Sequence, residues 1–581
     1  MNFSFFKKKR NEPEVAVQIE ETDERGAINS RRRWLSDIAM PAVAVAAGVS
    51  LPSMAAKATN LKKPDYLSGA RVFNIRDFGA KGDAKTLDTH ALQAAIDACN
   101  KDNGGIVLVP AGVFVIGTVE LKSNVTLHIA AQGKLLGTDD GKQYYAADAI
   151  PLDAGATMND GNVGLLFAAN AENIVIEGNG IIDGQGARFR SDVKGTLPPA
   201  GISGNHRPYH LLFHKCKNLT VKDISLINSA YHSVRVCFSS YVKMDGLHIR
   251  GRVIHNNDGF HFISSEYVHV SNCDVESQDD ACALFGSCKF VTVNNCTFST
   301  RWSVFRFGAG EAENITVSNC IIYETYGCPI KIHCLPGSRF ENISFSNLVM
   351  NGVTGPISIG LGSQSAQKSA NNKPAGIARN ISFNNIHATV VKPVPLRDAE
   401  FSSKYNPGEE FSCITLNAMD DVYLENITFN DVHIKYPGGG TAEQGAVRDV
   451  PKIAGEYYQM GVPPAYALYA RNVRALTMSN MRFEMAEPDK RPAVVFDNVH
   501  DAAINGLGMQ GQKEAESLLR FSNVTDVLIT ALRVLTPVSL ALLIEGPASN
   551  NLKIDGGDLS KATQPVALAA GVRKDAVKVR D

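Results

Sequence analysis

Two short clusters in the middle of the chain carry the residue types and spacing that acid–base chemistry requires. The first reads His255-Asn256-Asn257-Asp258-Gly259-Phe260-His261, and the second reads Ser277-Gln278-Asp279-Asp280-Ala281-Cys282-Ala283. Three carboxyl groups gathered in one cleft raise one another's pKa, which proton exchange near neutral pH requires. A solvated acidic turn, or a calcium site with oxygen ligands, is the alternative interpretation of the same residues.

A repeated phrase predicts how these two clusters are brought together. It consists of Asn or a substitute, alternating apolar residues and another apolar residue six positions on. It recurs from residue 218 to residue 342 at steps of 23, 26, 23, 24 and 28 residues. Alternation with period two is typical of strands, and a repeat of this length without amphipathic helices is typical of a parallel β-helix. We therefore predict an all-β, single-stranded parallel β-helix with coils about 4.8 Å apart.

This fold predicts the positions of the acidic residues. Asp258 and Asp279 are 21 residues apart, close to one coil, and are expected on neighbouring coils of one face. In a regular strand Asp279 and Asp280 would point to opposite faces and bury one charge at a cost of several kcal/mol. The pair is therefore expected at a turn or bulge, where both side chains reach a cleft.

The cysteines are also explained by the coils. Cys273, Cys296 and Cys320 occupy one position in three successive phrases, between Leu247 and Leu348 at the same position. We expect an interior ladder of small apolar side chains, since no CxxC pair is present and the neighbouring positions hold Leu. The total of 11 cysteines is odd, which excludes a fully paired disulfide framework. We predict no metal site and no cofactor.

The segment before the coils has a different pattern and is expected to cap the solenoid. Apolar residues of 86–99 recur at helical spacing, and 104–112 reads as a strand and turn. A solenoid needs its open apolar end covered, and an N-terminal helix suits that purpose. Phosphate binding by the glycines is the alternative, but neither GxGxxG nor P-loop spacing occurs.

Composition limits the classes of function. The 581 residues include 58 Lys and Arg against 59 Asp and Glu, and 44% are hydrophobic. The chain can therefore bury a large core, which excludes global disorder. A net charge of −1 argues against general nucleic-acid binding and leaves open a local basic cleft for an acidic substrate.

The N-terminus reads as an export signal. Polar residues 1–29 are followed by Ser30-Arg31-Arg32-Arg33-Trp34-Leu35, a mildly apolar run over 38–51, and Ser53-Met54-Ala55. The order resembles a twin-arginine signal, which implies a periplasmic or secreted protein. A disordered tail is the alternative. No later stretch reaches 18 consecutive apolar residues, so we expect no membrane span in the mature protein.

The resulting domain organisation has a single folded domain. We expect the signal and polar region at 1–55, a linker at 56–70, the β-helix at 71–560 and a C-terminal tail at 561–581. The cap is expected at 71–117, and long loops that wall in a groove are expected at 355–412 and 436–470.

The cap, the coil phrases, Asn256-x-Asp258-Gly259 and Gln278-Asp279-Asp280 together resemble the family 28 glycoside hydrolases, the polygalacturonase and rhamnogalacturonase group, over roughly residues 70–500. The resemblance implies a right-handed, pectin lyase-like β-helix and inverting hydrolysis without a metal. It also implies that Asp279 is the general acid, and that Asp258 and Asp280 position and activate water.

The chain departs from this family beyond the acidic pair. Where polygalacturonases carry Gly-His-Gly one coil later, residues 299–308 contain no His, and Pro329-Ile330-Lys331 keeps the Lys but loses the Arg of Arg-Ile-Lys. We expect Arg301, Trp302, Arg306 and Lys331 to bind the substrate, with the cations facing an acidic sugar and Trp302 as a stacking platform. Alternatively, Arg301 only neutralises the Asp cluster, and Arg306 points outward.

The sequence therefore predicts a hydrolase that acts on a pectin-type polysaccharide or oligosaccharide, galacturonan or rhamnogalacturonan. Two alternatives stay open. A polysaccharide lyase on the same fold would use Arg301 and Lys331 to neutralise a uronate, often with calcium, and a non-catalytic β-helix would only bind glycans. Calcium dependence and a new double bond in the product would identify the lyase.

The export signal provides the first testable prediction. Replacing Arg31 and Arg32 with Lys should leave full-length precursor in the cytoplasm, because the twin-arginine pathway reads that pair. Immunoblots of cytoplasmic and periplasmic fractions measure this. Unchanged processing and export of the variant would exclude the twin-arginine interpretation.

Overall fold

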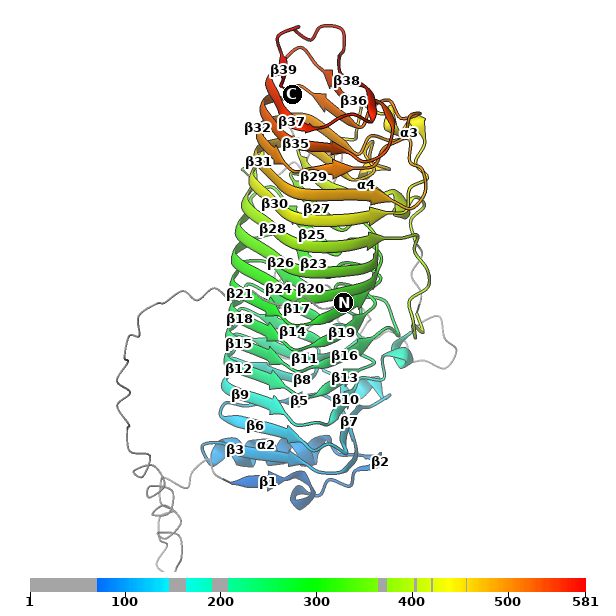
Figure 1. Ribbon diagram of the computed structural model, residues 1–581. Coiled ribbons are helices and arrows are strands. Elements are labelled where there is room, and N and C mark those ends of the chain that lie inside the picture. Colours follow the sequence, from blue (N-terminus) through cyan, green and yellow to red (C-terminus); the bar gives the residue numbers. More distant parts are fainter. Residues whose placement is uncertain are drawn as a thin grey trace, which may run out of the picture. The chain divides into compact units, whose positions relative to one another are not determined.

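The computed structural model describes residues 71–145, 163–190, 207–363, 374–401, 405–419, 422–455 and 457–580. The expected signal at 1–55 and linker at 56–70 lie outside these residues. Strands dominate the described chain and stack coil upon coil (Figure 1). Among the described residues, no helix is both long and apolar enough to cross a bilayer.

Each coil around the acidic clusters contributes three short strands, which pair in parallel with those of the next coil. Val234 pairs with Phe260, Phe260 with Cys282, and Cys282 with Phe305. This is the parallel β-helix that the repeats predicted. The strands of these coils are β14 (Val234–Cys237), β15 (Ser240–Asp245), β16 (His248–Gly251), β17 (Phe260–Ile263), β18 (Glu266–Ser271), β19 (Asp274–Ser277), β20 (Cys282–Phe285), β21 (Cys288–Asn294), β22 (Thr297–Thr300) and β23 (Phe305–Phe307).

Alternate side chains of these strands fill the interior. Phe260 and Phe262 of β17 are completely buried, as are Val268 and Val270 of β18. In later coils, neighbouring short strands are replaced by one longer strand. These longer strands are β24 (Glu311–Thr325), β26 (Arg339–Val353), β28 (Ile377–Val390) and β30 (Leu424–Tyr436). Because identical positions lie above one another, like residues stack, as Phe345 does on Phe383 with ring centroids 5.3 Å apart.

The backbone conformation explains why Asn is common at the first position of the repeated phrase. Asn218, Asn314 and Asn342 have φ between 57° and 59°, in the left-handed region that Asn adopts more readily than most residues. Their side chains also join neighbouring coils, since Asn342 Nδ2 donates to Asn314 Oδ1 at 3.2 Å. Where this position holds Tyr241 and Tyr267, stacked rings with centroids 4.9 Å apart replace the amide ladder.

The expected cysteine ladder is confirmed. Cys273, Cys296 and Cys320 are at most 2% exposed, and Cys320 pairs in register with Leu348. The thiol of Cys296 lies 3.4 Å from the backbone N–H of Cys273. All 11 cysteines lie among the described residues, are buried and form no disulfide, so they serve as core side chains.

A helix covers the N-terminal end of the coils, as the sequence predicted. Helix α2 (Thr89–Lys101) buries Leu92, Ala95, Ile96 and Cys99 and contacts β1 (Val72–Asn74) and β3 (Gly105–Val109). It begins later than the helical spacing suggested, because β2 (Asp83–Leu87) pairs with β4 (Gly112–Ile116) and Asp88 caps the preceding turn. The Asp88 carboxylate accepts the backbone N–H groups of Lys81 and Gly82 at 2.7 and 2.9 Å.

Two of the expected boundaries differ from the structure. The expected loop at 355–412 contains β27 (Ile357–Leu361) and β28, so that it is two separate loops joined by a coil. The expected tail at 561–581 contains β38 (Ala562–Leu568) and β39 (Val577–Arg580), which pair with β36 (Val538–Glu545) and β37 (Asn550–Asp558). The ladder continues there because each new strand finds backbone partners on the preceding coil.

Candidate active site

The acidic residues lie in the turns that enter β17 and β20. The register of these strands places Asp280 one coil after Asp258, and the backbone N–H of Gly259 donates to the Asp280 carbonyl at 2.9 Å. Asp279 precedes this position in a bend, where its N–H donates to the Asn257 carbonyl at 3.1 Å. The structure therefore brings all three carboxylates together at neighbouring turns, as the sequence predicted.

Each carboxylate of the Asp pair is held by short-range hydrogen bonds. Asp279 Oδ1 accepts the backbone N–H of Asp280 at 2.9 Å, and Asp279 Oδ2 accepts Asn256 Nδ2 at 3.3 Å. Asp280 Oδ1 accepts the backbone N–H of Ser303 from the next coil at 3.3 Å. Asp258 and Asp280 are buried at 4% and 7% exposure, whereas Asp279 remains partly exposed and so accessible to a ligand.

Burial makes all three carboxyl groups weaker acids. It raises the pKa of Asp280 to about 7, and the Asp279 charge adds to the effect. It raises the pKa of Asp258 well above the ordinary value, with further contributions from Asp279 and Asp280. Burial also raises the pKa of Asp279, against the opposing charges of Lys331 and Arg306. Proton exchange near neutral pH is therefore available at this site.

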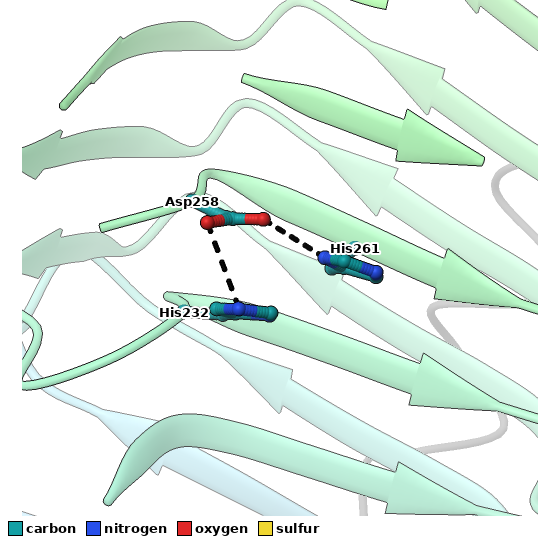
Figure 2. Close-up of side chains that lie close together, drawn as sticks. All are labelled: His232, Asp258 and His261. Atoms are coloured by element: carbon teal, nitrogen blue, oxygen red, sulfur yellow. Dashed lines mark hydrogen bonds and ion pairs between the residues drawn. The ribbon is translucent and has the colours of Figure 1, made fainter. Parts of the chain in front are cut away.

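Two histidines surround Asp258 (Figure 2). His261 Nδ1 lies 2.8 Å from Asp258 Oδ2, and His232 Nε2 lies 3.6 Å from Asp258 Oδ1. The two imidazole rings stack with centroids 4.5 Å apart and an interplanar angle of 13°. Burial holds the pKa of both histidines well below the ordinary value, so both rings are neutral.

This group also has the donor types of a metal site. Among the described residues, His232, Asp258 and His261 form the group of this kind whose candidate ligand atoms all lie within 4.8 Å of one another. Arg235 acts electrostatically on both His232 and Asp258, as does Arg207, and these cations oppose a bound dication. The expected absence of a metal stays a prediction.

Three of the four expected substrate-binding residues lie beside the carboxylates. Arg306 pairs in register with Lys331, and both act electrostatically on Asp279 and Asp280. Arg306 is partly exposed and directed outward, with its guanidinium 5.8 Å from the centre of the Phe285 ring. Lys331 Nζ lies 5.2 Å from the centre of the Trp302 ring. Lys331 is buried, whereas Arg306 and Trp302 are partly exposed, so two cations and one aromatic ring lie beside the Asp pair.

Arg301 is turned in another direction. Its Nη2 lies 3.3 Å from Glu409 Oε2, Nη1 donates to the Tyr326 carbonyl, and the rings of Tyr405 and Trp302 lie 4.2 and 5.3 Å from its central carbon. The side chains of Arg301 and Glu409 are 2% and 0% exposed. The Arg301 guanidinium is thus engaged by a buried carboxylate from a distant segment and faces Trp302.

Glu409 belongs to a segment that we name the loop arm, the described residues 391–401 and 405–412 between β28 and β29 (Ile414–Ala418). The arm reaches back to the turn after β16, where Arg252 Nη1 donates to the Arg397 carbonyl at 2.8 Å. There the ring of Phe401 lies 6.0 Å from that of His255. The loop arm therefore borders the candidate site through residues adjacent to Asn256 and Trp302.

Sequence reasoning missed His232, Arg207 and Arg235. Arg207 donates to the His255 carbonyl at 2.8 Å and to Asn256 Oδ1 at 3.2 Å, and so fixes the turn that carries Asp258. A signal existed for His232, because it precedes Asp258 by 26 residues, the same step that separates Tyr241 from Tyr267. Arg207 follows a long insertion, for which the repeat provides no register.

The fold and this site define a parallel β-helix with three carboxyl groups gathered at neighbouring turns, and sequence comparison identifies its family. The profile of glycosyl hydrolases family 28 matches residues 99–444, so the chain belongs to this family. The exo-poly-α-D-galacturonosidase of Dickeya chrysanthemi is 30% identical over 256 residues, which cover 36% of this chain and 41% of the relative. The chain thus spans about two fifths of the length of that relative.

Two further similarities extend over more of the chain. The exopolygalacturonase of Platanus acerifolia is 26% identical over 334 residues, covering 55% of this chain and 84% of the relative. The crystal structure of a hyperthermoactive exopolygalacturonase from Thermotoga maritima superposes with a TM-score of 0.54 at 18% identity, covering 71% of this chain and 91% of that one. This structural match confirms the right-handed, pectin lyase-like β-helix.

The raised pKa of Asp280 predicts that this residue costs stability at neutral pH. Between about pH 4 and 7 the folded protein holds a proton that the unfolded chain has lost, so stability falls as the pH rises through this window. Asp280→Asn should remove this pH-dependent loss of stability, because the amide does not titrate. We expect calorimetry to show a higher unfolding temperature than that of the native protein at pH 8 and little difference at pH 3.

The exposed carboxylate of Asp274, on the same solenoid, provides a matched control. Its side chain is 52% exposed, so Asp274→Asn should follow the pH dependence of the native protein. Equal destabilisation of Asp280→Asn at both pH values would contradict the prediction and would show that the Asp280 carboxylate stabilises its turn.

Proposed function

We propose that the protein hydrolyses glycosidic bonds of a pectin-type polysaccharide or oligosaccharide, galacturonan or rhamnogalacturonan. The observation that carries this proposal is the gathering of Asp258, Asp279 and Asp280 at neighbouring turns, with raised pKa values and two cations beside them. Family membership supports hydrolysis, and the polygalacturonan-directed names of the relatives support an acidic substrate.

In this proposal Asp279 is the general acid. It is the most exposed of the three carboxyl groups, and its raised pKa keeps a proton available at mildly acidic pH. The proton passes to the glycosidic oxygen as the bond to the anomeric carbon breaks. Asp258 and Asp280 hold a water molecule for attack on that carbon and accept its proton. The chain's own carboxylates therefore supply both acid and base.

We further propose that Arg306, Lys331 and Trp302 recognise the substrate. A carboxylate of a uronic acid suits the two cations, and a sugar ring suits the face of Trp302. We expected Arg301 to contact the substrate as well, but its guanidinium is buried against Glu409 and Tyr326. Its proposed role is therefore to position Trp302, which its guanidinium faces at 5.3 Å.

We also propose a domain organisation and a cellular location for the protein. Residues 71–560 form the catalytic β-helix with its cap, extended by the last strands up to Arg580. The N-terminal 55 residues direct export to the periplasm or beyond. A location outside the cytoplasm agrees with a polysaccharide substrate.

The general acid can be tested by one substitution. Asp279→Asn should lower turnover of the pectic substrate by about 10² or more, because leaving-group protonation is lost while the shape is kept. Reducing-end release from a panel of pectic oligosaccharides, with mass detection, measures this. Asp274→Asn is the matched control and should retain the native rate. Near-native turnover of Asp279→Asn would refute the assignment.

Stereochemistry provides a second test. Carboxyl groups on neighbouring coils, whose backbones are about 5 Å apart, reach across a cleft to separations that admit a water molecule beneath the sugar. A gap of about 6.5–9.5 Å between acid and base gives inversion, whereas retention needs about 5–5.5 Å. Proton NMR of the first reducing sugar, recorded before mutarotation, should show the inverted anomer. The retained anomer would exclude this mechanism.

A further inference from the structure

The surroundings of Asp258 present a problem that the carboxylates alone do not solve. A residue that accepts a proton from water must be ionised before the reaction. Asp258 is 4% exposed, and its burial and the two neighbouring carboxylates all favour the protonated form. Some group near Asp258 must therefore favour the charged form.

The coil register supplies two such groups. Val234 pairs with Phe260, so His232 and Asp258 occupy the same position in successive coils, two residues before these strands. Asp258 and His261 flank the start of β17 and point to the same side of it (Figure 2). The Asp258 carboxylate consequently lies beside the edges of the two stacked rings, and one nitrogen of each ring faces a different carboxylate oxygen.

The proton positions on the rings follow from their partners. Both rings are neutral, so each carries one N–H. Among the described residues, His261 Nε2 and His232 Nδ1 are buried without a hydrogen-bond partner. A buried N–H without an acceptor is rarer than a buried lone pair without a donor, so each proton belongs on the nitrogen that faces Asp258. Two N–H groups then point at this carboxylate, and the closer of them, on His261, is at hydrogen-bond distance.

The cations that face this pair favour an ionised Asp258 and neutral histidines. Arg207 and Arg235 favour the ionised form of Asp258. Arg235 and Arg306 keep His261 neutral, and His232, stacked on it, has Arg235 and Arg207 as its charged neighbours. Against them stand the charges of Asp279 and Asp280. Arg207 and Arg235 assist ionisation, and of the two imidazole contacts to the Asp258 carboxylate the one from His261, at 2.8 Å, is the shorter.

We propose that His261 is a positioning residue for the hydrolytic reaction: its Nδ1–H, oriented by stacking on His232, holds the Asp258 carboxylate ionised and aimed at the attacking water. This inference rests on the proposed function, since it assumes Asp258 as a base. His261 itself neither gains nor loses a proton in the cycle. Its contribution is to the charge and direction of Asp258.

The experiment compares pH profiles of kcat/KM for native protein, His261→Phe and His261→Asn on the pectic oligosaccharide that the native enzyme cleaves. Phe keeps a flat ring against His232 but has no N–H, so the acidic limb should move up by about one pH unit, a loss of about tenfold below the midpoint. Asn places an amide N–H near the position of Nδ1 and should restore most of the native profile.

His248 provides a matched control, since its Nδ1 lies 3.2 Å from Asp274 Oδ2 in an exposed pair outside the site. His248→Phe should leave the profile unchanged. A His261→Phe enzyme with the native acidic limb would overturn the proposal, as would an equal loss of rate at every pH in both His261 variants.

A second measurement separates this inference from the proposed function. Nitrogen-15 NMR of the histidine rings, assigned with the His261 variants, should show the Nδ1–H tautomer of His261 in the native protein and a changed signal in Asp258→Asn. This readout requires no substrate. An Nε2–H tautomer would overturn the inference alone, whereas an Nδ1–H tautomer in a protein that cleaves no pectic substrate would refute the proposed function and leave only the contact between His261 and Asp258.

Discussion

The stacking of coils in strict parallel register governs both the interior and the candidate site of this protein. Backbone hydrogen bonds between coils fix each residue over its counterpart about 4.8 Å away, so chemistry on one face is assembled from residues roughly one coil apart in the sequence. His232, Asp258 and Asp280 share one such position. The interior obeys the same rule through Phe345 and Phe383. One geometric repeat thus determines both core and site.

The same register concentrates charge that the fold must tolerate. Three carboxyl groups lie at two adjacent turns, and two of them are buried. Arg306 and Lys331 on one side, with Arg207 and Arg235 on the other, offset part of this repulsion. Buried like charges favour proton uptake, and this is the property that acid–base catalysis exploits. The gathered carboxyl groups therefore lower the stability of the folded protein at neutral pH.

The loop arm makes contacts between coils that are not neighbours in the solenoid. A coil contacts only its neighbours, but the arm crosses several coils and joins the turn at Arg252 to the segment around Glu409. The buried pair of Arg301 and Glu409 fixes this connection, because separating either charge from its partner would leave it unpaired in a dry interior. The contacts of the loop arm thus come from an insertion, while the positions of the carboxylates follow from the register.

The β-helix, the capping helix, the cysteine ladder and the gathering of Asp258 with Asp279 and Asp280 could all be predicted from the amino-acid pattern. These features follow from period-two alternation and from spacing by one coil length, and both patterns can be read directly along the sequence. Three features became visible only in the folded protein: Arg301 pairs with Glu409, 108 residues away, His232 stacks on His261, and the ladder continues past residue 560. Such partners depend on the lengths of irregular insertions and on side-chain direction, because a repeat fixes which residues are neighbours and leaves the choice among their contacts to packing and charge.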